Sequence, residues 1–158
     1  MFTGKILIDA DACPVKQLVR AEAQKRGIPL IMVADDSHLL QDDYATVVTV
    51  SQGADAADYK LIGLTAPGDL VVTQDYGVAS MALGKGAAAI SNEGLIFTAD
   101  IIDRLLFERH IGKRLRQTGR KSPKNRPRSP ADNQRFLQAL ISILEQDTNS
   151  IEKEVHAL

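Results

Sequence analysis

The sequence has very little cysteine, few aromatic residues and no long apolar run. The single cysteine, Cys13, excludes an internal disulfide framework and any metal site built from several cysteines. Tryptophan is absent and aromatics make up only 4% of the residues, which argues against a base-stacking platform of the RNA-recognition type. No apolar stretch approaches the ~18 residues that a membrane-spanning helix needs, and the N-terminus lacks the apolar core of a signal peptide. We therefore expect a cytoplasmic protein that does not enter a membrane.

The charge is unevenly distributed along the chain. The 158 residues carry a formal net charge of −1, but residues 109–131 hold nine Lys and Arg and no acid. The remainder of the chain holds ten basic and 20 acidic residues, so its net charge is −10. A basic segment on an acidic body is typical of proteins that bind phosphate groups, although such a run can also be a solvated tail.

Short apolar runs alternate with helical patterns along most of the chain. We predict strands over residues 5–9, 29–34, 45–50, 70–73 and 87–90. Between and after them we predict helices from Pro14 to a stop at Gly27, over 53–64, over 76–83 and over 98–118. This alternation favours a three-layer α/β/α fold around a mostly parallel sheet of about five strands.

The chain is predicted to contain one domain with a C-terminal addition. Residues 1–118 form the α/β domain, and 119–130, rich in Pro and basic residues, form a flexible segment. Residues 131–146 form a last helix, capped by Ser129, that packs on the same domain, and 147–158 form a tail. The apolar face of this helix is expected to be Phe136, Leu137, Leu140, Ile141 and Leu144.

Several carboxylates are expected at one edge of the sheet. Asp9 ends the first strand and Asp75 follows the fourth, and these strands are plausible neighbours at the switch point of a doubly wound sheet. Asp55 and Asp58 open the helix that follows the third strand, and Asp11 lies just beyond Asp9. Carboxylates that converge repel one another unless a cation is present, and oxygen ligands suit Mg²⁺ or Mn²⁺. We predict these five residues as metal ligands, with Asp9 and Asp75 as the catalytic pair.

Each of these residues also has an ordinary structural interpretation. Asp55 or Asp58 could be a helix cap or a partner of the helix dipole, and Asp11 could cap the helix that starts at Pro14. Cys13 lies near the same helix start, which could lower its pKa and make it a nucleophile, although packing of a small side chain is the favoured interpretation.

Polar residues elsewhere are predicted to contact a substrate. Asn92 follows the fifth strand at the same edge of the sheet as the carboxylates. Arg109, Lys113 and Arg116 have the spacing of one helical stripe. The predicted substrate-binding residues are Asn92, Arg109, His110, Lys113, Arg116, Lys121 and Lys124. A basic stripe beside an acidic metal site suits phosphodiester chemistry, because the stripe neutralises phosphates while the metal activates a water for in-line displacement.

Four motifs carry a resemblance to a known family. They are IDADACPV at 8–15, GADAADYKL at 53–61, DLVVTQDYGVA at 69–79 and KSPKNRP at 121–127. Together they resemble the bacterial YaiI/YqxD family over roughly residues 5–145. That family is similar to the PIN-like superfamily of Mg²⁺- or Mn²⁺-dependent nucleases, whose parallel sheet carries acids at its strand ends. The resemblance implies that Asp9, Asp75 and one of Asp55 and Asp58 hold the metal.

Three functions remain open from the sequence. The first is a PIN-like, metal-dependent nuclease whose partner is nucleic acid, with RNA favoured over DNA. The second is a nucleic-acid-binding protein without catalysis. The third is a haloacid-dehalogenase-like phosphatase in which Asp9 is the nucleophile, Asp11 the acid and base, and Lys85 the required lysine. The sequence leaves the oligomeric state open.

Overall fold

The order of helices and strands follows the predicted alternation. A computed structural model describes residues 2–35, 41–51, 53, 55–117 and 127–146. The elements, in chain order, are β1 (Ile6–Asp9), the 3₁₀ helix η1 (Ala10–Ala12), α1 (Lys16–Arg26), β2 (Leu30–Asp35), β3 (Thr46–Val50), α2 (Ala56–Leu64), β4 (Leu70–Val72), α3 (Tyr76–Gly84), β5 (Ala88–Ile90), α4 (Ala99–Gln117) and α5 (Pro130–Glu145). In the described part of the chain, no helix is long and apolar enough to cross a membrane.

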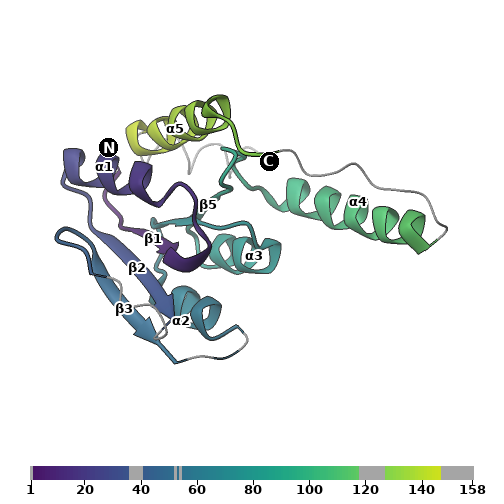
Figure 1. The fold of residues 1–158 in the computed structure, drawn as a ribbon, viewed down its shortest axis with the longest axis horizontal. Helices are drawn as coiled ribbons and strands as arrows, with labels where there is room; N and C mark the ends of the chain where they lie inside the picture. The colour runs from purple at the N-terminus through teal and green to yellow at the C-terminus, as the bar shows by residue number, and fades with distance from the viewer. Residues whose placement is uncertain (1, 36–40, 52, 54, 118–126, 147–158) are drawn as a thin grey trace.

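The five strands form one parallel sheet in the order β3-β2-β1-β4-β5. β1 lies at the centre, where Ile8 is in register with Met32 of β2 on one side and with Val72 of β4 on the other. Figure 1 shows the twisted sheet with helices around it. The predicted parallel α/β architecture and the pairing of the first strand with the fourth are both confirmed. The carboxyl ends of these strands therefore meet at one edge.

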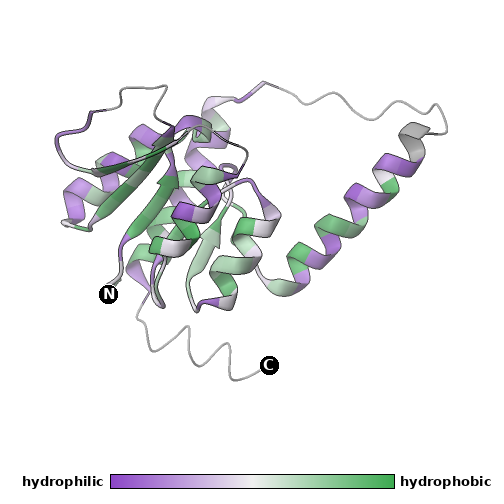
Figure 2. Cartoon of the chain, turned by 90° about the horizontal axis from the view of Figure 1, so that it is seen from below, coloured by the Kyte–Doolittle hydropathy of each residue, from purple (hydrophilic) through white to green (hydrophobic). Residues whose placement is uncertain are grey.

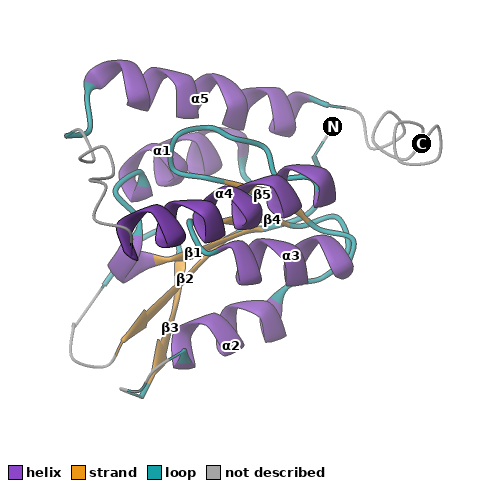
Figure 3. Cartoon of the chain, turned by 90° about the vertical axis from the view of Figure 1, so that its right-hand side faces the viewer, coloured by secondary structure: helices purple, strands orange, loops and turns teal. Residues whose placement is uncertain are grey.

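Helices cover both faces of the sheet, as Figure 3 shows. Side chains alternate across β1, so Ile6 and Ile8 enter the core that includes α1 and α5, while Leu7 enters the core that includes α2, α3 and α4. All three side chains are fully buried. A strand that is apolar on both faces is what a sheet covered on both sides requires.

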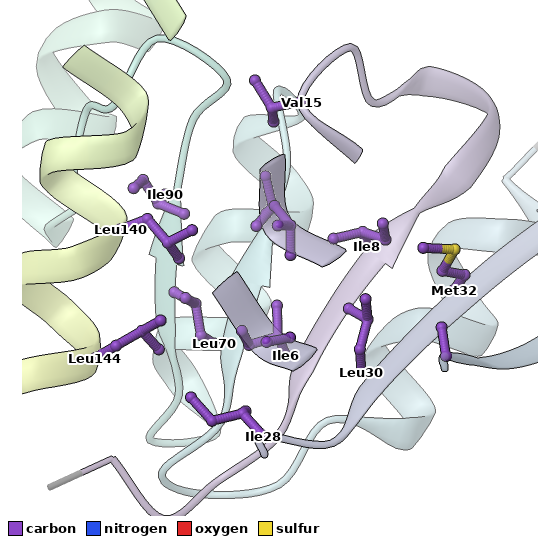
Figure 4. Packing of buried hydrophobic residues seen from close by; sticks show 14 of the residues in the cluster. Ile6, Ile8, Val15, Ile28, Leu30, Met32, Leu70, Ile90, Leu140 and Leu144 are labelled. Carbon is purple, nitrogen blue, oxygen red and sulfur yellow. The ribbon is translucent and has the colours of Figure 1, made fainter. Parts of the chain in front are cut away.

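The last helix is part of the main core. Ser129 caps α5, and its side chain and that of Asp132 form a reciprocal capping box, with Pro130 at the first helical position. Phe136 and Leu140 are completely buried, and Figure 4 shows Leu140 and Leu144 packed beside the side chains of β1, β4 and β5. One prediction was wrong in detail. Ile143, not Ile141, is the buried isoleucine, because the helix lies rotated relative to the predicted face.

The predicted ends of the other helices agree with the structure at some positions and differ at others. Gly27 ends α1 in the left-handed conformation, with a φ of 67°, as expected of a glycine stop. The start predicted at Pro14 was early, since α1 begins at Lys16. Thr98 accepts a hydrogen bond from the backbone of Ile101 at the start of α4, as predicted. Most of the predicted flexible segment, 119–130, and the predicted tail, 147–158, lie outside the described residues.

Candidate active site

Asp9 stands at the carboxyl end of the central strand. It is the last residue of β1, and its Oδ1 accepts a hydrogen bond of 3.2 Å from the backbone N–H of Asp11, within η1. Burial raises the pKa of Asp9, and repulsion from Asp11 adds to this, while backbone N–H groups of Asp11 and Ala12 act in the opposite direction. A half-buried carboxylate at this position is electrostatically costly to the fold.

Asp75 stands at the end of the neighbouring strand and also caps a helix. It follows β4, and its Oδ1 accepts hydrogen bonds from the backbones of Gly77 (2.8 Å) and Val78 (3.1 Å) at the start of α3. Its own N–H donates to the hydroxyl of Thr73 at 3.0 Å. These bonds fix the orientation of the carboxylate. They use only one of its oxygens.

Asp58 and Asp55 approach this edge from α2. Burial raises the pKa of Asp58, and repulsion from Asp75, Asp9 and Asp55 raises it further. Asp58 is therefore close enough to the three other carboxylates, which come from two further places in the chain as well as its own, to feel the charge of each. Because these side chains are carboxylates, the site is negatively charged.

Asp55 does not fit the simple capping interpretation. It occupies the N-cap position of α2, but its side chain makes no capping hydrogen bond. Its φ of 66° is the only positive φ of a non-glycine residue in the described part of the chain. A left-handed conformation at such a residue costs about 1 kcal/mol or more, and such outliers cluster at functional sites.

The four carboxylates supply only oxygen ligands, which suit a hard divalent cation. As the side chains stand, no three His, Cys, Asp or Glu residues form a group that could hold a metal ion within the described residues. Mg²⁺ commonly binds through one or two protein carboxylates, with waters and substrate phosphates completing its shell. The chemistry of the donors fits such a cation. The ligand assignment remains a prediction.

Asp11 has a structural task that the sequence did not indicate. Its Oδ2 accepts a hydrogen bond of 2.7 Å from the backbone of Asp35, so it joins the turn after β1 to the end of β2. The predicted capping of the following helix by Asp11 was wrong, since Val15 holds the cap position of α1. The contact holds the turn that carries Asp9 against the sheet.

Cys13 does not have the properties of a nucleophile, and Lys85 does not lie where a phosphatase would need its lysine. Burial raises the pKa of Cys13 to about 11, and its side chain packs against the core, in agreement with the favoured packing interpretation and not with a nucleophile of lowered pKa. Lys85 donates to the carbonyls of Ile62 (2.6 Å) and Thr65 (3.3 Å) beside the end of α2. It lies at the end of α3 opposite to Asp75, roughly 15 Å along the helix. The structure therefore does not bring Lys85 to Asp9.

Gln74 and Arg128 contact residues at the carboxyl edge of the sheet, beside the site, and neither was predicted from the sequence. Gln74 donates to both carboxylate oxygens of Glu93 at 3.0 Å and accepts from the backbone of Asn92 at 2.9 Å. Arg128 donates to the carbonyl of Asn92 at 2.8 Å. Asn92 itself is buried, so it serves the framework of this edge. Gln74 could have been identified from the sequence, because it is a polar residue directly before Asp75, just after a buried strand.

An open hollow of about 840 Å³ extends from Asp75 to α4. Its lining residues are Gln74, Asp75, Tyr76, Gly77, Leu105, Leu106, Glu108 and Arg109. Tyr76 packs edge-on against Phe97, with ring centroids 6.1 Å apart. One predicted carboxylate and one predicted substrate-binding arginine thus border the same space.

The remaining predicted basic residues are only partly described. His110 and Lys113 are exposed on α4, and Lys113 lies one helical turn beyond Arg109. Position 116 continues the spacing within α4, but its side chain is outside the described residues, as are Lys121 and Lys124. Arg109 and Lys113 are therefore exposed on one side of α4, and their role in binding a substrate stays a prediction.

Known proteins were compared with this chain. The family model described as "Uncharacterized BCR, YaiI/YqxD family" matches residues 7–146. The chain belongs to the YaiI/YqxD family. A UPF0178 protein of Ruminiclostridium cellulolyticum is 49% identical over 144 residues, covering 91% of this chain and 94% of the relative. A UPF0178 protein of Lachnoclostridium phytofermentans is 48% identical over 143 residues, covering 89% and 96%.

The chain is also similar to a solved structure. It is the crystal structure of a mutant of Rae1 (YacP) from Bacillus subtilis, with 18% sequence identity and a TM-score of 0.42. The similarity covers 87% of this chain and 92% of that one.

Proposed function

We propose that this protein is a PIN-like, metal-dependent nuclease that hydrolyses phosphodiester bonds, with RNA favoured over DNA. The observation that carries the proposal is that Asp58, at the start of α2, is repelled by both Asp75 and Asp9, which follow or end the paired strands β4 and β1. A fold that keeps three opposed carboxylates at one edge gives up stability there, which is characteristic of functional sites.

The strand-end pair Asp9 and Asp75 would hold a Mg²⁺ or Mn²⁺ ion, with Asp58 and Asp55 near it. A bound divalent cation neutralises charge on a phosphate and makes a water more acidic for in-line attack. The capping bonds of Asp75 keep its carboxylate in place without a substrate. Such preorganisation suits catalysis by electrostatic stabilisation.

Arg109 would hold the nucleic acid beside these carboxylates. It lines the hollow that begins at Asp75, and Lys113 extends positive charge along the same side of α4. A phosphate between Arg109 and the carboxylates requires a cation on the acidic side, because an anion is otherwise repelled. Acidic and basic side chains border the same hollow. This combination favours phosphodiester chemistry over simple nucleic-acid binding.

The experiment is cleavage of labelled single-stranded RNA and DNA with Mg²⁺, Mn²⁺ or EDTA. Asp75→Asn is the informative variant, because asparagine is as good a helix cap as aspartate but lacks the charge. Asp43→Asn is the matched control, since Asp43 is exposed just before β3, at the opposite edge of the sheet. We expect metal-dependent cleavage by the wild type and Asp43→Asn, and a loss of roughly a hundredfold or more in Asp75→Asn.

The assay also separates the alternatives. Equal cleavage by the wild type and Asp75→Asn would refute the assigned site. Salt-sensitive binding without cleavage by any of the three proteins would favour the binding protein without catalysis. Trapping of a phosphorylated Asp9 would favour the phosphatase.

A further inference from the structure

The outer face of α4 combines exposed apolar side chains with charges in an ordered pattern. Phe107 is 64% exposed and Ile111 is 38% exposed. Figures 1 and 2 show α4 extending away from the sheet, with apolar and polar residues along its exposed length. The inner side of the helix is different, because Ile102 is buried and Arg109 lines the hollow.

The outer face can be defined from helical geometry. At 3.6 residues per turn, five residues fall within an arc of about 80° on the side away from Ile102. These residues are Asp100, Asp103, Phe107, Ile111 and Arg114. We call this set the outer stripe. Its acids lie near the N-terminal end, its apolar pair in the middle and its arginine near the C-terminal end.

This order of charges is self-complementary in one orientation only. Asp100 lies seven residues before Phe107 and Arg114 lies seven after it, which is about 10.5 Å along the axis in each direction. A second α4 that runs antiparallel, with a two-fold axis at Phe107, places the partner's Arg114 opposite Asp100. A parallel second helix would place like charges opposite each other, which is unfavourable.

The helix dipole alone does not account for the pattern. Acids at the start and bases at the end of a helix suit its dipole on any face. The dipole gives no reason for Phe107 to be exposed between them on the same face. In the described part of the chain, Asp100, Asp103 and Arg114 have no ion-pair partner. Both the charges and the apolar side chains of the outer stripe are therefore available.

We propose that the outer stripe is a dimer interface in which α4 pairs antiparallel with α4 of a second copy of this chain. Two-fold pairing brings the two Phe107 side chains together at its centre, with an Ile111 about 6 Å along the axis on each side, and it places an Arg114 opposite an Asp100 at each end. A single helix pair is near the lower limit of specific interface size, so the dimer dissociates at micromolar concentrations. The hollow with Asp75 and Arg109 stays open, because it lies on the other side of the helix.

The test is sedimentation velocity on the full chain over a concentration series at low and high salt. We expect a monomer–dimer equilibrium that is weaker at high salt. Phe107→Asp should raise the dissociation constant by about tenfold or more. Tyr59→Asp is the matched control, because Tyr59 is an exposed aromatic (73%) on α2, and it should leave the equilibrium unchanged.

A charge exchange tests the orientation. Asp100→Arg and Arg114→Asp should each weaken the dimer, and the double variant should recover much of the loss by reversing the pair. A chain that is monomeric at every concentration would overturn the proposal. So would a dimer that is insensitive to Phe107→Asp, or one that the double variant weakens additively. Because the readout is mass, the result does not depend on whether the protein cleaves nucleic acid.

Discussion

Replacing Asp58 with asparagine is expected to stabilise the protein in the absence of divalent cations. The wild-type side chain is half-buried. Burial raises the pKa of Asp58, and repulsion from Asp75, Asp9 and Asp55 raises it further. Removal of one such charge from an exposed or partly exposed cluster is worth about 0.5–1 kcal/mol. For a chain of 158 residues this corresponds to a rise in Tm of about 1–4 °C.

The pH dependence of this gain follows from the raised pKa. Well above the pKa of the folded state, Asp58 is charged in the folded and unfolded chain, and the full repulsion is present. As pH falls through that pKa, the folded protein binds a proton and the repulsion disappears. The difference in stability between Asp58→Asn and wild type should therefore be largest at neutral pH and should close on acidification.

Thermal unfolding in a chelating buffer at neutral and acidic pH measures this difference, with Asp43→Asn as the control for a remote exposed carboxylate. Addition of Mn²⁺ should stabilise the wild type more than Asp58→Asn, because a cation relieves the repulsion that the variant already lacks. A variant that is less stable than wild type at neutral pH, without metal, would refute the description of these carboxylates as mutually repelling.

Three further predictions concern the framework around the site. Cys13 should react with iodoacetamide far more slowly at pH 8 in the folded protein than after denaturation, because burial raises its pKa to about 11; equal rates would contradict this. Phe136→Ala should lower the free energy of unfolding in urea by about 3–5 kcal/mol, since the ring is fully buried, and a change below about 1 kcal/mol would mean that α5 is not part of the core. Ser129→Ala should lower the same quantity by about 1 kcal/mol through loss of the capping box, with Ser129→Asp, another good cap, close to wild type.

The sequence predicted the order of elements because that order depends on local pattern. Apolar runs of β-branched residues, such as the one ending at Asp9, define buried strands, and the following helices carry their own stop signals. The adjacency of β1 and β4 followed from the rules of doubly wound sheets, and it places Asp9 and Asp75 at the same edge of the sheet.

Features that depend on contacts between distant segments were not predictable in the same way. The bond from the backbone of Asp35 to Asp11 joins residues 24 apart, and Gln74 meets Glu93 across 19 residues. The left-handed backbone of Asp55 was not predictable either, because the residue at that position is not a glycine. Whether Ile143 or Ile141 enters the core depends on how α5 is rotated about its axis, and the apolar pattern of this helix does not fix that rotation.

Cleavage of an RNA with sulfur in place of a non-bridging oxygen at the scissile phosphate tests the central claim most directly. Mg²⁺ binds sulfur poorly, whereas the softer Mn²⁺ tolerates it. If a cation held by Asp9 and Asp75 contacts that phosphate, one sulfur stereoisomer should be cut slowly in Mg²⁺ and recover in Mn²⁺, while the unmodified RNA is cut in both. Cleavage that is indifferent to sulfur in both metals, or no cleavage of the unmodified RNA in either, would contradict the account.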